Sequence, residues 1–142
     1  MRTRFFFLLL FLIALSVAAQ RTLIIETDSH QHIYFDEEKD EPVVLSVEES
    51  WMFFGIDEAA TLLTQKSSES DELLKYNITD STFDELEMIT TYYMIDQEGF
   101  ECLATLDKPR QQLIIAYING EDKVMMNLYE IQKLYYSDKT EN

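Results

Sequence analysis

The sequence is poor in the residues that build covalent cross-links and most catalytic sites. One cysteine, Cys102, and two histidines, His30 and His32, occur among its 142 residues. A single cysteine excludes an internal disulfide and any zinc site with paired cysteines. The short motifs of serine hydrolases, zinc proteases and nucleotide-binding loops do not occur. We therefore predict no catalytic site, no cofactor and a fold held together by packing.

Basic residues are also scarce. Lys and Arg number 11 against 27 Asp and Glu, which gives a formal net charge of −16. Such a surface repels nucleic acid backbones and anionic lipid, so we expect neither as a partner. A basic protein or a divalent cation would be a more suitable partner for this charge. The charge could equally serve only to keep the protein soluble. We expect the partner to be a protein or a small ligand, and composition leaves its identity and the oligomeric state open.

One long apolar run, Phe5–Leu15, stands near the start of the chain. Arg2 and Arg4 precede it, and the small residues Val17 and Ala19 follow it. The run is too short to span roughly 30 Å of hydrocarbon, and no stop-transfer pattern follows. This pattern is typical of a secretory signal peptide.

Cleavage after residue 19 would leave a chain that begins at Gln20. Residues 1–19 hold two arginines and no acid, so the net charge of residues 20–142 is −18. We expect export to the periplasm or the cell exterior, with no membrane anchor after cleavage. The ending Ala-Ala-Gln resembles the signals of small exported proteins of Gram-negative bacteria. The sequence Asn77-Ile78-Thr79 matches an N-glycosylation acceptor, which matters only in a eukaryotic secretory pathway.

Beyond the signal, the chain reads as short strands joined by turns. Alternating apolar and polar residues and clusters rich in β-branched and aromatic residues favour strands. Three glycines and two prolines are few for so many turns, so Asp, Asn and Ser must supply much of the turn chemistry. The acidic run 36–41 and the polar run 65–72 read as surface loops. The expected strands are 23–26, 32–35, 42–47, 51–56, 74–78, 88–95, 100–106 and 111–118.

Two segments leave alternatives open. Asp57 could cap a short helix over 57–63, where apolar residues fall at helical spacing, or the segment could be a strand followed by a loop. Residues 123–131 favour a last strand that pairs back on 111–118, although Val124, Leu128 and Ile131 also fall at helical spacing.

These patterns predict one all-β domain over residues 20–142, mostly antiparallel. It would be a β-sandwich or an open β-barrel meander, with or without one short helix, and its core would be the meander 88–131. Cys102 alternates with apolar neighbours, which predicts a buried, inert thiol. Both faces of the strand 111–118 are apolar, which predicts a central strand covered on both sides.

Asp28, His30 and His32 form the candidate metal site. Side chains two residues apart on a strand share a face, so one carboxylate and two imidazoles could meet a single ion there. The competing interpretation is a solvated segment near the new N-terminus. The acidic residues of 36–41 could bind calcium, but they lack the ligand spacing and the glycine of an EF-hand loop. We therefore interpret them as solvated surface charge.

Tyrosines gather in the C-terminal half, where alternation on strands would aim several at one face. Such a face either packs across strands or binds a sugar or apolar ligand. We therefore expect an exported, non-catalytic binding or interaction protein. The alternatives are an acidic inhibitor or immunity-type protein that blocks a basic site on a partner, and a small periplasmic hydrolase.

Overall fold

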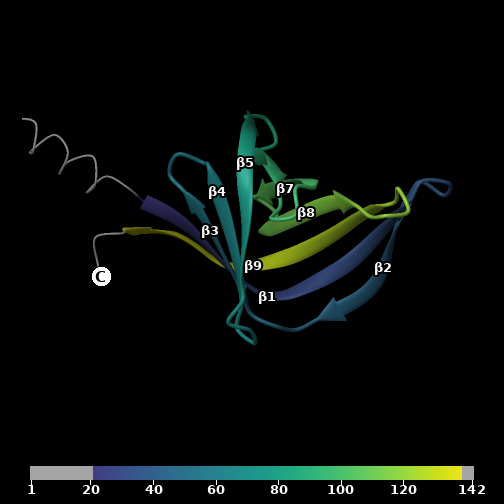
Figure 1. Cartoon of the computed structure of the whole chain (residues 1–142), viewed down its shortest axis with the longest axis horizontal. Helices are drawn as coiled ribbons and strands as arrows, with labels where there is room; N and C mark the ends of the chain where they lie inside the picture. The colour runs from purple at the N-terminus through teal and green to yellow at the C-terminus, as the bar shows by residue number, and fades with distance from the viewer. Residues whose placement is uncertain (1–20, 139–142) are drawn as a thin grey trace, which may run out of the picture.

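The computed structural model describes residues 21–138, which form nine strands and no helix (Figure 1). The predicted signal peptide, residues 1–19, lies outside the described residues. The strands are β1 (Arg21–Asp36), β2 (Glu41–Glu48), β3 (Met52–Asp57), β4 (Leu62–Ser67), β5 (Leu73–Asp84), β6 (Ile89–Ile95), β7 (Glu101–Asp107), β8 (Gln112–Ile118) and β9 (Val124–Asp138). Between residues 21 and 138 there is no helix long and apolar enough to cross a membrane.

Eight of the strands close into an antiparallel barrel. From β3 to β9 each strand pairs with the next along the chain, and β1 joins β3 on one side and β9 on the other. The ninth strand, β2, lies outside this ring and pairs with the distal part of β1. The all-β, mostly antiparallel prediction is confirmed, and the pairing of β1 with β9 makes the meander a closed barrel.

The first strand is longer than the sequence pattern predicted. The stretches 23–26 and 32–35 belong to one strand, because no glycine or proline interrupts residues 21–36. The pairing of β1 with β9 shifts register around Asp28, and such a bulge bends a strand without ending it. The bend lets the first half of β1 pair with β3 and the second half pair with β2.

Residues 58–61 form a turn between β3 and β4, so of the two alternatives for 57–63 the short helix is wrong. The Asp57 carboxylate accepts hydrogen bonds from the backbone N–H groups of Thr61 at 2.7 Å and Leu62 at 2.8 Å. Ala60 takes a left-handed backbone conformation with φ 53°. Asp57 therefore caps no helix, and its oxygens close the turn between β3 and β4.

The favoured strand at 123–131 is confirmed as part of β9. Met125, Tyr129 and Ile131 are buried, and they face the interior together because they stand at alternate positions of the strand. The β6–β7 hairpin that 88–106 predicts is also present, as is the exposed turn at 37–40.

The core fills one half of the barrel. Ile25, Leu63 and Leu113 are fully buried there and pack with Phe54 and Leu106. These residues come from five different strands. Apolar burial of this kind is the main stabilising contribution to the fold.

The strand β8 is central, but only one of its faces is covered. Leu113 and Ile115 point into the barrel and are buried, whereas Ile114 and Ala116 lie on the outer face and are partly exposed. The prediction that both faces are covered is wrong, because a barrel is one layer of sheet and its outer face meets solvent.

Candidate functional site

The two ends of the barrel differ. The end near the 57–61 and 108–111 turns holds the packed core and has a smaller hollow of about 430 Å³, whose lining includes Leu23, Ile56 and Tyr92. At the other end, near the turns 68–72, 96–100 and 119–123, a cavity of about 1030 Å³ opens into the barrel. We call this cavity the cup. Its lining comprises Gln65, Leu74, Tyr76, Asp96, Gly99, Phe100, Glu101, Cys102, Ile115, Tyr117, Ile118, Asn119, Gly120, Asp122, Asn127 and Tyr129.

A chain of polar side chains crosses the inner part of the cup. The hydroxyl of Tyr76 donates to Oε1 of Gln65 at 3.2 Å, and Nε2 of Gln65 donates to the Tyr129 hydroxyl at 3.4 Å. The Tyr129 ring meets the Phe54 ring edge-on, with the ring centres 4.8 Å apart. Gln65 is buried, so these hydrogen bonds replace the water that its amide loses.

Burial keeps the hydroxyls of Tyr76 and Tyr129 protonated. It raises the pKa of Tyr76 to about 12, with Cys102 and Asp96 adding to the shift. It also raises the pKa of Tyr129 well above the ordinary value. Both phenols therefore remain neutral hydrogen-bonding groups at physiological pH.

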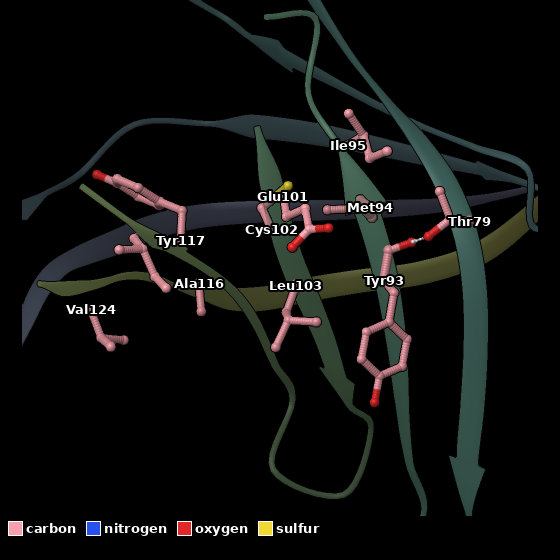
Figure 2. A pocket seen from close by; sticks show the side chains of 11 residues that line it. Thr79, Tyr93, Met94, Ile95, Glu101, Cys102, Leu103, Ala116, Tyr117 and Val124 are labelled. Atoms are coloured by element: carbon pink, nitrogen blue, oxygen red, sulfur yellow. Dashed lines mark hydrogen bonds between the residues drawn. The ribbon is translucent and has the colours of Figure 1, made fainter. Parts of the chain in front are cut away.

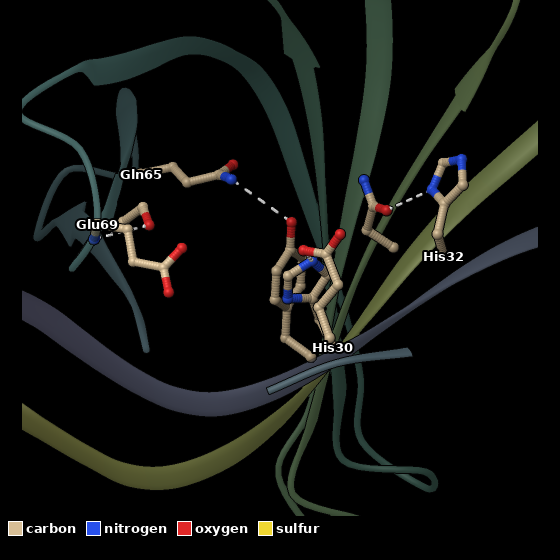
Figure 3. Close-up of polar contacts among 8 residues, drawn as sticks. His30, His32, Gln65 and Glu69 are labelled. Carbon is tan, nitrogen blue, oxygen red and sulfur yellow. Dashed lines mark hydrogen bonds and ion pairs between the residues drawn. The ribbon is translucent and has the colours of Figure 1, made fainter. Parts of the chain in front are cut away.

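The two histidines lie on β1, beside the hydrogen-bonded side chains of Tyr76, Gln65 and Tyr129 (Figure 3). Nε2 of His30 is 3.1 Å from Oε2 of Glu48, and its ring centre is 5.2 Å from that of Tyr129. Nδ1 of His30 is buried and has no hydrogen-bond partner among residues 21–138. Nδ1 of His32 lies 2.7 Å from Oδ1 of Asn127, so the ring nitrogen donates to the amide oxygen.

Asp28 does not join the histidines. Its Oδ1 accepts a hydrogen bond from Nε2 of Gln132 at 3.1 Å, at the bulge in β1. Across residues 21–138, no three His, Cys, Asp or Glu side chains are grouped so that they could hold a metal ion. Metal binding by Asp28, His30 and His32 stays a prediction, and each of the three side chains has another polar partner.

The charge of the cup is of one sign. Asp96, Glu101 and Asp122 line it, whereas Lys and Arg are absent from its lining. Three carboxylates around an opening favour cationic or neutral molecules and disfavour anions.

The buried position predicted for Cys102 is confirmed. Its side chain faces the cup, and burial, with Asp96 adding to it, raises the pKa of the thiol to about 11. A thiol that stays protonated at neutral pH is a poor nucleophile.

A second hollow of about 530 Å³ lies on the outer face of β6, β7 and β8 (Figure 2). Tyr93, Leu103 and Ala116 contribute to it, and Figure 2 shows Tyr93 and Leu103 on the side of the sheet opposite Met94. The hydroxyl of Thr79 donates to the backbone oxygen of Tyr93 at 3.1 Å. We call this hollow the outer groove.

Sequence patterns found only part of the cup. Tyr117 and Tyr129 belong to the tyrosine cluster of the C-terminal half and do face the interior with Tyr92, whereas Tyr93 of the same cluster is exposed. Gln65 was predicted to begin a surface loop, yet it is a buried residue of β4. The alternation of Leu63 with Gln65 is the signal that could have placed it.

No protein-family model, curated protein or solved structure matches this chain.

Proposed function

We propose that this chain is an exported, non-catalytic binding protein that holds a small, neutral or cationic amphipathic molecule in the cup. The observation that carries this proposal is the cup itself. Its volume of about 1030 Å³ suits a small organic molecule, since ligand sites commonly enclose roughly 300–1000 Å³.

The lining suggests the chemistry of the ligand. Leu74, Phe100 and Ile118 offer apolar surface, while Gln65 and Asn127 offer amide hydrogen-bonding groups deeper in the barrel. Small-molecule sites usually have a mostly apolar wall with a few convergent polar groups, and the cup has a larger polar share than that. The acidic lining residues make an anionic ligand unfavourable.

Several features favour binding over hydrolysis. The thiol of Cys102 is buried with a raised pKa, and a catalytic thiol would instead need an activating base. The imidazoles of His30 and His32 contact Glu48 and Asn127, and within residues 21–138 neither is hydrogen-bonded to a Ser, Thr or Cys side chain. The signal-peptide pattern of residues 1–19 supports export.

A pair of fluorescent probes tests the ligand chemistry. Phenylnaphthylamine is an uncharged aromatic molecule, and anilinonaphthalene sulfonate is its anionic relative. We expect the purified exported protein to bind phenylnaphthylamine with one saturable site, and to bind the sulfonate about tenfold or more weakly because of the acidic lining. Fluorescence titration at low ionic strength measures both affinities.

Two neighbouring residues supply a matched pair of variants. Leu74 lines the cup, and Leu73 lies on the opposite, exposed face of the same strand. Leu74→Trp fills part of the cup and should weaken phenylnaphthylamine binding by about tenfold or more. Leu73→Trp should leave the affinity unchanged. Equal affinities of the two variants, or a sulfonate that binds as well as the amine, would contradict the proposal.

A further inference from the structure

The strand β2 has one edge that no strand covers. It pairs with β1 from His30 to Asp36, and within residues 21–138 it is the terminal strand of the sheet order. All eight of its residues are exposed. Backbone N–H and C=O groups along a free edge can pair with another extended chain.

The exposed side chains of this edge strand are apolar. Val44, Leu45 and Val47 are 52%, 54% and 63% exposed, and Val43 is 36% exposed. Edge strands commonly carry lysines or inward-pointing charges that block pairing. Residues 43–47 hold no charge, so the middle of β2 lacks this protection.

A bulge and a proline are the protective features that β2 does have. His32 pairs with Ser46 and Ile33 pairs with Val44, which leaves Leu45 as the extra residue of the bulge. Pro42 removes one backbone donor near the start of the strand. Neither feature covers the side chains of 43–47.

Acidic residues stand at both ends of the apolar stretch. The turn before it contains Glu37, Glu38 and Asp40 together with one base, Lys39, and Glu41 begins the strand. Glu48 and Glu49 follow the apolar stretch. The segment therefore combines a free edge, an apolar centre and negative charge at each end.

We propose that β2 binds an extended segment of a partner protein that has an alternating apolar centre and Lys or Arg at both ends. The segment pairs with the free edge of β2 by backbone hydrogen bonds, its apolar side chains contact Val44, Leu45 and Val47, and its basic ends meet the acids beyond them. Strand addition of this kind takes affinity from the main chain and specificity from side chains. This surface is separate from the cup.

A second copy of this chain fits the edge less well. An antiparallel self-pairing that sets Leu45 opposite Leu45 and Val43 opposite Val47 also sets Glu41 opposite Glu49. Like charges opposite each other destabilise a strand pair. The net charge of −16 per chain adds long-range repulsion between copies.

Synthetic peptides test the partner chemistry without changing the protein. The first probe alternates valine and threonine and carries lysines at both ends. The second replaces the lysines with glutamates, and the third is the first with every backbone amide between the lysines methylated, which blocks both of its edges. We expect the lysine peptide to bind about tenfold or more tightly than the glutamate peptide. The methylated peptide should not bind, because it cannot pair along the edge.

Matched variants locate the contact. Leu45→Lys places a charge in the middle of β2, whereas Leu86→Lys makes the same change at a residue that is 96% exposed in the β5–β6 turn. Leu45→Lys should weaken lysine-peptide binding by about tenfold or more, and Leu86→Lys should leave it unchanged. The double variant Glu41→Lys with Glu49→Lys should reduce the preference for the lysine peptide over the glutamate peptide, because it removes one acid and adds one base at each end of the stretch.

Three results would overturn the proposal. The first is no binding of the lysine peptide, and the second is equal binding of the methylated peptide, which would assign the contact to a side-chain face. The third is a concentration-dependent dimer that Leu45→Lys abolishes, since a second copy would then occupy the edge. Each result leaves phenylnaphthylamine binding in the cup unaffected, so failure here is distinguishable from failure of the proposed function.

Discussion

The carboxylate of Asp57 fixes the turn between β3 and β4. It accepts hydrogen bonds from the backbone of Thr61 and Leu62 and from the Thr61 hydroxyl. Burial by itself would raise the pKa of Asp57, but these hydrogen bonds outweigh it and the pKa is lowered from 3.8. The folded state therefore holds the ionised form more strongly than the unfolded chain does.

This lowered pKa predicts a pH-dependent effect of Asp57→Asn. The stabilisation by Asp57 is fully present above the unfolded pKa and is lost as the pH falls through the lower folded pKa. At neutral pH the variant should lose about 1 kcal/mol of unfolding free energy, since an amide has one acceptor oxygen in place of two. Denaturant unfolding at neutral pH and at a pH below the folded pKa measures the difference, which should shrink in acid.

Asp71→Asn is the matched control, because Asp71 is exposed in the 68–72 loop. It should leave the unfolding free energy nearly unchanged at either pH. A difference for Asp57→Asn that persists undiminished in acid would contradict the role assigned to its carboxylate.

Single polar residues were the hardest part of the cup to predict. Gln65 is followed by a run of polar residues, so the local pattern there resembles a loop. Its burial depends on Tyr76 and Tyr129, which supply its hydrogen bonds from other strands. The only local sign of its burial is its alternation with Leu63, and its hydrogen-bond partners lie far along the chain.

The two faces of β8 differ in how well their side chains are packed. Leu113 and Ile114 are neighbours in sequence but lie on opposite faces of the single sheet layer. Leu113 is fully buried, whereas Ile114 is partly exposed on the outer face. The two positions therefore differ in packing while sharing backbone pairing with β7 and β9.

Truncation at these two positions should have unequal effects. Leu113→Ala leaves a cavity in the packed half of the barrel and should lower the unfolding free energy by about 2 to 5 kcal/mol. Ile114→Ala removes a partly solvated side chain and should lower it by about 1 kcal/mol or less. Denaturant midpoints of the two variants give the comparison. If Ile114→Ala were the more damaging change, the outer face of β8 would be the covered one.

Strand positions in the C-terminal half could be predicted because alternation and turn residues agree there. The β6–β7 hairpin and β8 follow from local sequence, and pairing with β8 settles β9 as a strand despite its helical spacing. The length of β1 could not be predicted, because a bulge at Asp28 interrupts the alternation of the strand. The sequence pattern therefore indicates two short strands where there is one continuous strand.

Closure of the sheet into a barrel gives the whole molecule an interior surface and an exterior surface. The pairing of β1 with β9 joins the two ends of the described chain. No local pattern encodes a contact of this sequence separation, which is why the sequence left sandwich and open barrel as alternatives. Closure also buries the phenols and the thiol that face inward.

The enclosed interior predicts loss of stability in alkali. Burial raises the pKa of Tyr76, Tyr92, Tyr117 and Tyr129, and that of Cys102. Groups whose folded pKa is raised contribute stability that is present below the unfolded pKa and is lost as the pH rises toward the folded value. The unfolding free energy should therefore decline above about pH 9, where unfolded thiols and then phenols ionise.

Phenolate absorbance gives the measurement. At about pH 11 the native protein should show less phenolate than the same protein in guanidinium, because the inward-facing tyrosines stay protonated. Superimposable native and denatured titration curves would mean that the barrel interior is open to solvent.

We expect a small neutral ligand to bind in the cup and not in the outer groove. Amide chemical-shift mapping during a titration with phenylnaphthylamine distinguishes the two sites. Binding in the cup should give saturable shifts at Leu74, Tyr76 and Asn127, with Leu73 little affected. Shifts confined to Tyr93, Leu103 and Ala116 of the outer groove, or no saturable shifts at all, would contradict it.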